Sequence, residues 1–310
     1  MTVDTRPVSP PPAPRASRLR RRSAQPRPAR GPLPASTSAV LWGLTAVSAL
    51  ALWAVLYPVL IGGLQEQDQQ QRLFGRFRSQ LSQATAPLSP TSYGRPVALL
   101  DIPAAGLKGA VVVEGTGGRD LEAGPGHRRD TVLPGQVGTS VVLGRSVAFG
   151  APFGRLPSLR PGDRIVATTG QGVFTYSVDR LRRPGDLLPS PLGAGQGRLV
   201  LATSEGSGWR SGFAPTSVLY VDASLKGKAQ PVGGPLGAPV PASERPMGTS
   251  TQPLLALVLW LEALVVAVAG AVWPRSRWGT WQSWLVSVPV LLAIAIGASG
   301  VGAQMLPNLL

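Results

Sequence analysis

The sequence predicts a mainly β domain outside the membrane joined to three transmembrane α-helices, and three observations lead to this fold class. Short runs of β-forming residues alternate with Gly-, Pro- and Asp-containing turns between Arg95 and Leu225. Three apolar stretches flank this region, each long enough to cross a bilayer. Arginines gather before the first stretch and between the second and third, as in proteins whose basic loops stay in the cytoplasm.

The composition excludes several kinds of chemistry. The chain has no Cys, which rules out disulfides, thiolate catalysis and thiolate metal ligands. Its one histidine, His127, cannot form a multi-histidine metal site. We therefore expect no metal and no cofactor.

The net charge of +15 is concentrated at one end, because eight arginines lie in the first thirty residues. Residues 1–38 are rich in Pro, Arg, Ser and Ala and lack apolar periodicity, so we expect a disordered cytoplasmic tail. No aromatic residue is interleaved to stack on bases, and membrane topology explains the arginines. We therefore expect no nucleic-acid partner.

The predicted membrane spans are residues 39–64, 254–273 and 284–303. The loop at 274–283 carries Arg275 and Arg277, and tryptophans at its borders are typical of the membrane interface. The tail and this loop are both basic, so both are predicted to be cytoplasmic. This makes a multi-pass plasma-membrane protein whose β domain and C-terminus are extracellular.

One acid, Glu262, lies inside the second predicted span. An intramembrane carboxyl is costly and suggests a functional contact, for example with a membrane-protein partner. A protonated Glu262 bonded to a neighbouring helix would instead be structural, and both interpretations stay open. Small residues at Ala293, Gly297 and Val301 offer a face for helix packing.

Two segments connect the spans to the β domain. Residues 65–94 are predicted to form a stalk helix and a linker, with Leu73, Phe74, Phe77 and Leu81 at helical spacing. An amphipathic helix of this kind is suited to rest on the membrane surface. Residues 226–253 are rich in Pro, Gly and Ser and are predicted to be a linker.

Seven short strands are predicted within residues 95–225, which suits a closed barrel or a sandwich. They are Val97–Ile102, Ala110–Glu114, Ser140–Leu143, Arg164–Thr168, Val173–Val178, Leu199–Ala202 and Val218–Val221. The sixth ends at Thr203 and Ser204, just before a Gly-rich loop. A small polar residue at such a junction is well placed to act as a nucleophile, although Ser204 could equally just end the strand.

Three ordered stretches together resemble the sortase family, in particular the class E type of actinobacteria. They are Ala151–Leu156 followed by Leu159–Val166, then Gly172–Val178, and upstream Val112–Thr116 leading to Gly124–His127. The resemblance covers Ala98 to Leu225. It implies an eight-stranded β-barrel and a transpeptidase of the Gram-positive cell envelope, which cuts a C-terminal sorting signal and joins the protein to the cell wall or to a pilin.

The resemblance also implies a Cys nucleophile, a His acid/base and an Arg that stabilises the oxyanion or the substrate. Here Ser204 stands at the Cys position, Arg145 at the His position, and Arg210 is the possible Arg. His127 matches a separate Gly-Pro-Gly-His motif, and we expect it to support a loop.

A serine hydroxyl needs a base within reach, and the guanidinium of Arg145 cannot accept a proton. We therefore expect a non-catalytic, sortase-like binding or scaffolding protein of the cell envelope, a pseudoenzyme. The alternatives are a transpeptidase or hydrolase that uses Ser204, and a membrane assembly partner that acts through its helices.

The expected ligand is an envelope protein or peptide, for example a segment like a sorting signal. Arg145, Ser204 and Arg210 together would give a positive floor for a carboxylate or an anionic envelope polymer. Alternatively, Arg145 lies along the barrel surface in an exposed ion pair.

Overall fold

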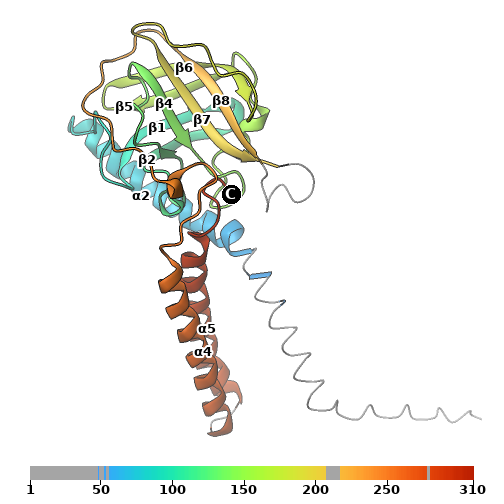
Figure 1. Cartoon of the computed structure of the whole chain (residues 1–310). Helices are drawn as coiled ribbons and strands as arrows, with labels where there is room; N and C mark the ends of the chain where they lie inside the picture. Colours follow the sequence, from blue (N-terminus) through green and yellow to red (C-terminus); the bar gives the residue numbers. More distant parts are fainter. Residues whose placement is uncertain (1–47, 49–51, 54–55, 207–216, 278–279) are drawn as a thin grey trace, which may run out of the picture. The chain divides into compact units, whose positions relative to one another are not determined.

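The computed structural model describes residues 48, 52–53, 56–206, 217–277 and 280–310, without the side chains of 268–269 and 271–284. Eight strands form a closed barrel in the order β1-β2-β3-β4-β7-β8-β6-β5 (Figure 1). Strand β1 closes it by pairing with β5 as well as β2. The predicted β-barrel is therefore confirmed.

The strands reproduce every predicted β run and add one. They are β1 (Pro96–Ile102), β2 (Leu107–Glu114), β3 (Gly126–His127), β4 (Gly138–Leu143), β5 (Arg164–Thr169), β6 (Gly172–Arg182), β7 (Gly197–Glu205) and β8 (Ser217–Lys226). The additional strand is β3, which the sequence did not predict because two residues make no apolar run. Three short helical segments join strands: η2 (Pro103–Ala105), α3 (Gly118–Leu121) and η3 (Leu156–Ser158).

Most neighbouring strands are antiparallel, but β2 pairs with β3 and β4 pairs with β7 in parallel. The barrel interior is filled by aliphatic and aromatic side chains that alternate along the strands, including Leu100, Ile165, Tyr176 and Leu201. The parallel β4–β7 pair is central to the site, because both strands lead into loops at the same end of the barrel.

Helix α2 (Gly62–Ser82) overlaps the stalk helix predicted within residues 65–94, and it is packed on the barrel. Leu73 is buried against Val111 and Val113 of β2. The Gln70 amide accepts from the Val111 backbone N–H at 2.7 Å and donates to the Ala123 carbonyl at 2.6 Å. Helix α2 therefore satisfies backbone groups that β3 is too short to pair.

The segment predicted as a linker at 226–253 also lies on the barrel. Gln230 bridges to Gln136, and Gly237 N–H donates to the Arg129 carbonyl at 3.0 Å. The segment contains the short helix η4 (Ala242–Glu244), whose Glu244 carbonyl accepts from the Thr116 hydroxyl at 2.8 Å. The Pro/Gly-rich composition of this segment explains why it has little regular structure, but it does not indicate that the segment contacts the barrel.

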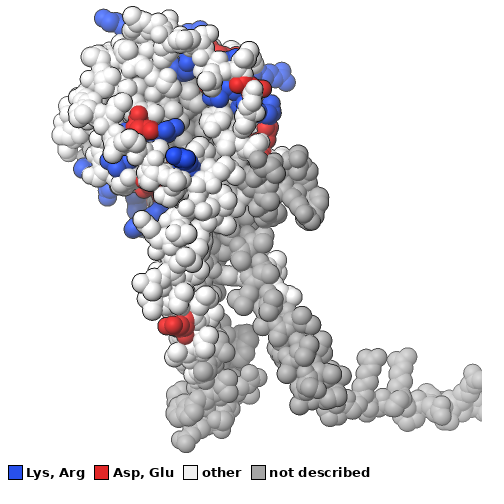
Figure 2. Space-filling view, in the orientation of Figure 1, with Lys and Arg blue, Asp and Glu red and all other residues white. Residues whose placement is uncertain are grey.

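Two long helices follow, α4 (Leu254–Arg277) and α5 (Thr280–Ala303). They pack side by side, with the Trp260 ring against Gly297. Helix α4 ends at Arg277 and α5 begins at Thr280, so both extend into the loop predicted at 274–283. Figure 2 shows charged side chains gathered on the barrel, whereas the described side chains of the helical part of this face are almost all uncharged.

Within the described residues, one helix is long and apolar enough to cross a membrane, over the 19 residues Leu285–Ala303 of α5. The apolar part of α4, Leu254–Ala267, is shorter. The predicted first span at 39–64 lies mostly outside the described residues, and its end forms the π-helical turn η1 (Tyr57–Ile61), which continues into α2. One of the three predicted spans is thus supported by length and composition.

Candidate functional site

The parallel pairing of β4 with β7 brings the two key loops together. Leu143 is the register partner of Ala202, so the chain after β4 and the end of β7 leave the barrel side by side. Gly144 N–H donates to the Ala202 carbonyl at 3.0 Å, and the Thr203 hydroxyl donates to the Gly144 carbonyl at 3.0 Å. We call the group formed by Ser146, Ala148 and Ser204 at this junction the strand-end site.

Ser204 is only 4% exposed, and its hydroxyl is fully engaged. It donates to the Leu309 carbonyl at 2.7 Å, and its Oγ lies 2.6 Å from the Oγ of Ser146. Because Ser204 donates its single hydroxyl proton to the Leu309 carbonyl, Ser146 is the donor in the hydrogen bond between the two hydroxyls. Among the described side chains, none with a titratable group hydrogen-bonds to Ser204.

Residues 308–310, far along the chain, fill the space beside Ser204. Ser146 N–H donates to the Leu309 carbonyl at 3.1 Å, and Ala148 N–H donates to the Leu310 backbone oxygen at 3.1 Å. The Leu309 side chain is fully buried in an apolar cluster with Leu121, Leu143, Ala202 and Val218. Figure 1 places the label C near the lower ends of β7 and β8, in agreement with these contacts.

Arg145 is fully buried, which excludes the alternative of an exposed surface ion pair. Its Nη2 donates to the Gly118 carbonyl at 2.9 Å, and its guanidinium lies 4.7 Å from the centroid of the Phe149 ring. Its Nε and Nη1 have no hydrogen-bond partner within the described residues. Burial lowers the pKa of Arg145 to about 10, partly offset by Glu122, so the group stays cationic at neutral pH.

Arg145 and Ser204 thus come from adjacent strand ends, but no described hydrogen bond joins their side chains. The guanidinium acts electrostatically on Glu122 rather than contacting the serine. Burial raises the pKa of Glu122 to about 7, and Arg145 lowers it in part. The sequence did not identify Glu122, since a lone carboxylate after a short helix has no distinctive pattern.

The other candidate bases are committed elsewhere. His127 is buried, with Nε2 2.9 Å from the Val132 carbonyl and Nδ1 3.3 Å from Glu114, as expected for a residue that supports a loop. Glu205 follows Ser204 on β7 and therefore points to the opposite face of the strand. It accepts two bonds from Arg183, at 2.6 and 2.9 Å, which lower its pKa and weaken it as a base.

Two predicted residues lie away from this junction or outside the description. Arg210 lies outside the described residues. Glu262 is exposed on α4, and no described hydrogen bond links it to another helix.

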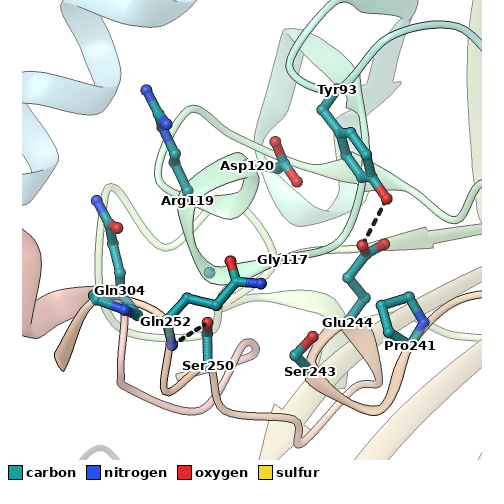
Figure 3. Close-up of a pocket in the computed structure, with 12 residues that line it drawn as sticks. Tyr93, Gly117, Arg119, Asp120, Pro241, Ser243, Glu244, Ser250, Gln252 and Gln304 are labelled. Carbon is teal, nitrogen blue, oxygen red and sulfur yellow. Dashed lines mark hydrogen bonds between the residues drawn. The ribbon is translucent and has the colours of Figure 1, made fainter. Parts of the chain in front are cut away.

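A polar pocket of about 610 Å³ opens next to α3 (Figure 3). Tyr93 donates to Glu244 at 2.8 Å on one side, and Arg119, Gln252 and Gln304 line the other. Burial raises the pKa of Asp120, between them, to about 6. The lining thus combines hydroxyl and amide groups with two carboxyls and one guanidinium.

The sequence missed Ser146 and Leu309 as members of the site. Ser146 stands next to the predicted Arg145, and the β4–β7 register alone could have indicated it. Leu309 carries no local signal, because its role depends on a contact across 105 residues of chain.

The comparisons with known proteins agree with the barrel. The family model described as the sortase domain matches residues 100–205. None of the curated proteins matches the sequence at a significant level.

Several solved structures are similar to the chain. Sortase E from Streptomyces avermitilis is 33% identical, with a TM-score of 0.37, over 47% of this chain and 97% of that one. SrtF sortase from Corynebacterium diphtheriae is 26% identical, with a TM-score of 0.38, over 51% and 95%. A sortase D5 transpeptidase from Clostridium perfringens is 22% identical, with a TM-score of 0.44, over 52% and 99%. The domain match and the identity to nearly the whole of a sortase E show that the chain belongs to the sortase family.

Proposed function

We propose that this chain is a membrane-anchored, non-catalytic sortase-like protein that binds a peptide or scaffolds a complex of the cell envelope. The observation that carries the proposal is the environment of Ser204. Its described partners are a hydroxyl and a backbone carbonyl, neither of which can take up its proton. The buried Arg145, at the position that the resemblance gives to the family base, is cationic at neutral pH.

The size of the expected loss in reaction rate favours a binding function over residual catalysis. Loss of a positioned general base costs roughly 10²–10⁴ in rate, and a serine without that base has almost no alkoxide at neutral pH. A scaffold that keeps its backbone hydrogen-bond donors can recognise a peptide backbone, because such binding needs no proton transfer.

A turnover assay tests the proposal. The full chain in detergent, incubated with a peptide carrying a cell-wall sorting signal and an amine acceptor, should give no cleavage or ligation product by mass spectrometry. An active sortase supplies the positive control. Product that is lost in Ser204→Ala would overturn the proposal and establish the serine-dependent enzyme instead.

The membrane part of the proposal rests on α5 and on the position of the arginines. We infer a cytoplasmic N-terminal tail and an extracellular barrel, because the tail and the end of α4, at Arg275 and Arg277, carry basic charge. A membrane-impermeant maleimide applied to intact cells should label Ser190→Cys on the barrel and not Ser17→Cys in the tail. The absence of native Cys makes each variant a single-thiol reporter. The opposite labelling would reverse the orientation.

A further inference from the structure

We propose that residues 308–310 are an intramolecular ligand of the strand-end site, which makes this site a receptor for an extended apolar peptide that the chain itself occupies. The inference rests on the proposed binding function and names the ligand of the same site. It is carried by four sets of contacts that come from different parts of the chain.

The first set is a backbone docking surface. Ser146 and Ala148, two residues apart, donate their N–H groups to successive backbone oxygens of Leu309 and Leu310, each at 3.1 Å. The Ser204 hydroxyl adds a donor to the Leu309 carbonyl at 2.7 Å, and the Ser146 Oγ lies 3.2 Å from the same oxygen. An extended peptide is recognised in this way, by main-chain bonds that are independent of its side chains.

The second set gives the site a side-chain preference. Leu309 is 0% exposed and completes an apolar cluster of barrel residues. Without it, Leu121, Leu143 and Val218 would expose apolar surface beside free N–H donors. The site therefore selects an aliphatic residue at the position of Leu309.

The third set holds the segment from the other side. The Asn308 side-chain amide donates to the carbonyls of Ser243 and Arg245 at 2.7 and 2.8 Å, and its N–H donates to the Gly248 carbonyl at 3.1 Å. The segment around η4 thus packs over the ligand, which explains why a Pro/Gly-rich stretch is tied to the barrel.

The fourth contact is steric. A Cβ on Gly118 would lie 2.8 Å from the Gln304 carbonyl oxygen, so the backbone at 304 approaches α3 as closely as glycine allows. Gly118 is also the residue whose carbonyl accepts from Arg145. The buried arginine therefore supports the wall against which the segment lies.

The ligand follows α5 directly, and this links occupancy of the site to the helix. Ala303 ends α5 and is buried with Leu306, Tyr57 and Phe149, and Phe149 lies on the loop that carries Ser146. The segment that fills the site is therefore continuous with the helix that is apolar enough to lie in the membrane.

Thiol reactivity tests the proposal in the full chain, because the chain has no native Cys. The Ser204→Cys thiol should react with a small maleimide at least about tenfold more slowly than the exposed Ser190→Cys thiol. Adding Leu309→Asp places a charge in the apolar cluster and should bring the rate at position 204 to within about threefold of the exposed control. Leu187→Asp, at a leucine that is 84% exposed, is the matched control and should leave the thiol slow.

Folding is monitored by Ser140→Cys, a thiol in β4 where the native serine is 1% exposed. It should stay protected in every background. If Leu309→Asp unprotects it, Asn308→Ala replaces that variant, because it removes two hydrogen bonds and keeps Leu309. A fast Ser204→Cys thiol in the parent chain, or no increase in a folded Leu309→Asp or Asn308→Ala variant, overturns the proposal.

The two proposals fail separately. Turnover of peptide with a protected Ser204→Cys thiol would overturn the non-catalytic function and leave the occupied site. A freely reactive thiol without turnover would overturn the intramolecular ligand alone.

Discussion

Replacement of Arg145 tests whether the charge or the volume of its buried side chain stabilises the fold. It is a buried cation with one neutral hydrogen bond and one aromatic contact. Since a buried charge can be exchanged for an apolar side chain of similar volume, Arg145→Met should change the free energy of unfolding by no more than about 1.5 kcal/mol. Arg145→Ala should lose about 2–5 kcal/mol because it leaves a cavity. Chemical denaturation measures both, and equal large losses would show that the charge itself is required.

Glu122 makes a pH-dependent contribution to stability. Burial raises its pKa from 4.5 to about 7 in the folded chain, so the folded state binds more protons than the unfolded state between these values. Stability should therefore fall as the pH rises through this window. Glu122→Gln should remove this part of the slope, so that its Tm relative to the parent rises from pH 4.5 to pH 8.

Asp68→Asn, at an exposed carboxylate of α2, is the matched control for Glu122→Gln. Differential scanning calorimetry at several pH values makes the comparison. A difference in Tm between Glu122→Gln and the parent that does not change with pH would contradict the assigned cause.

At the scale of elements, the close contact between β4 and the loop that follows it can be tested at Gly144. A Cβ there would collide with the Phe153 ring, which is fully buried in the core. Gly144→Ala should therefore destabilise the barrel by about 1–3 kcal/mol through overpacking. Gly162→Ala has open space around it but a positive φ of 95°, so it shows the backbone cost alone. Denaturation midpoints that are equal for the two variants would contradict the packing explanation.

The elements also show what the sequence could predict. Seven strands were predicted because alternating or continuous apolar runs such as Val97–Ile102 must be buried. Strand β3 was not predicted, because a strand of two residues makes no apolar run and is defined only by its pairing with neighbouring strands. A helix within residues 65–94 and an irregular segment at 226–253 were predicted, but their contacts with the barrel were not. Composition indicates regular structure, whereas Gln70 and Gln230 bind the barrel through individual hydrogen bonds.

At the scale of the whole molecule, the candidate site could be predicted only in part. The positions of Ser204 and Arg145 followed from the family resemblance, and the β4–β7 register brings these strand ends together. The burial of Arg145 and the occupation of the site by Leu309 depend on long-range packing, which local sequence patterns do not encode. The fold is thus shared with the sortases, whereas the loss of their chemistry at this junction is our proposal.

The nucleophilicity of Ser204 is the most direct test of this account, because it requires no knowledge of the substrate. The full chain is treated with a serine-directed fluorophosphonate, and adducts are located by intact mass and peptide mapping. The account predicts no adduct at Ser204, since no base among the described residues contacts its hydroxyl and Leu309 covers it. A stoichiometric adduct at Ser204 that disappears in Ser204→Ala would contradict it.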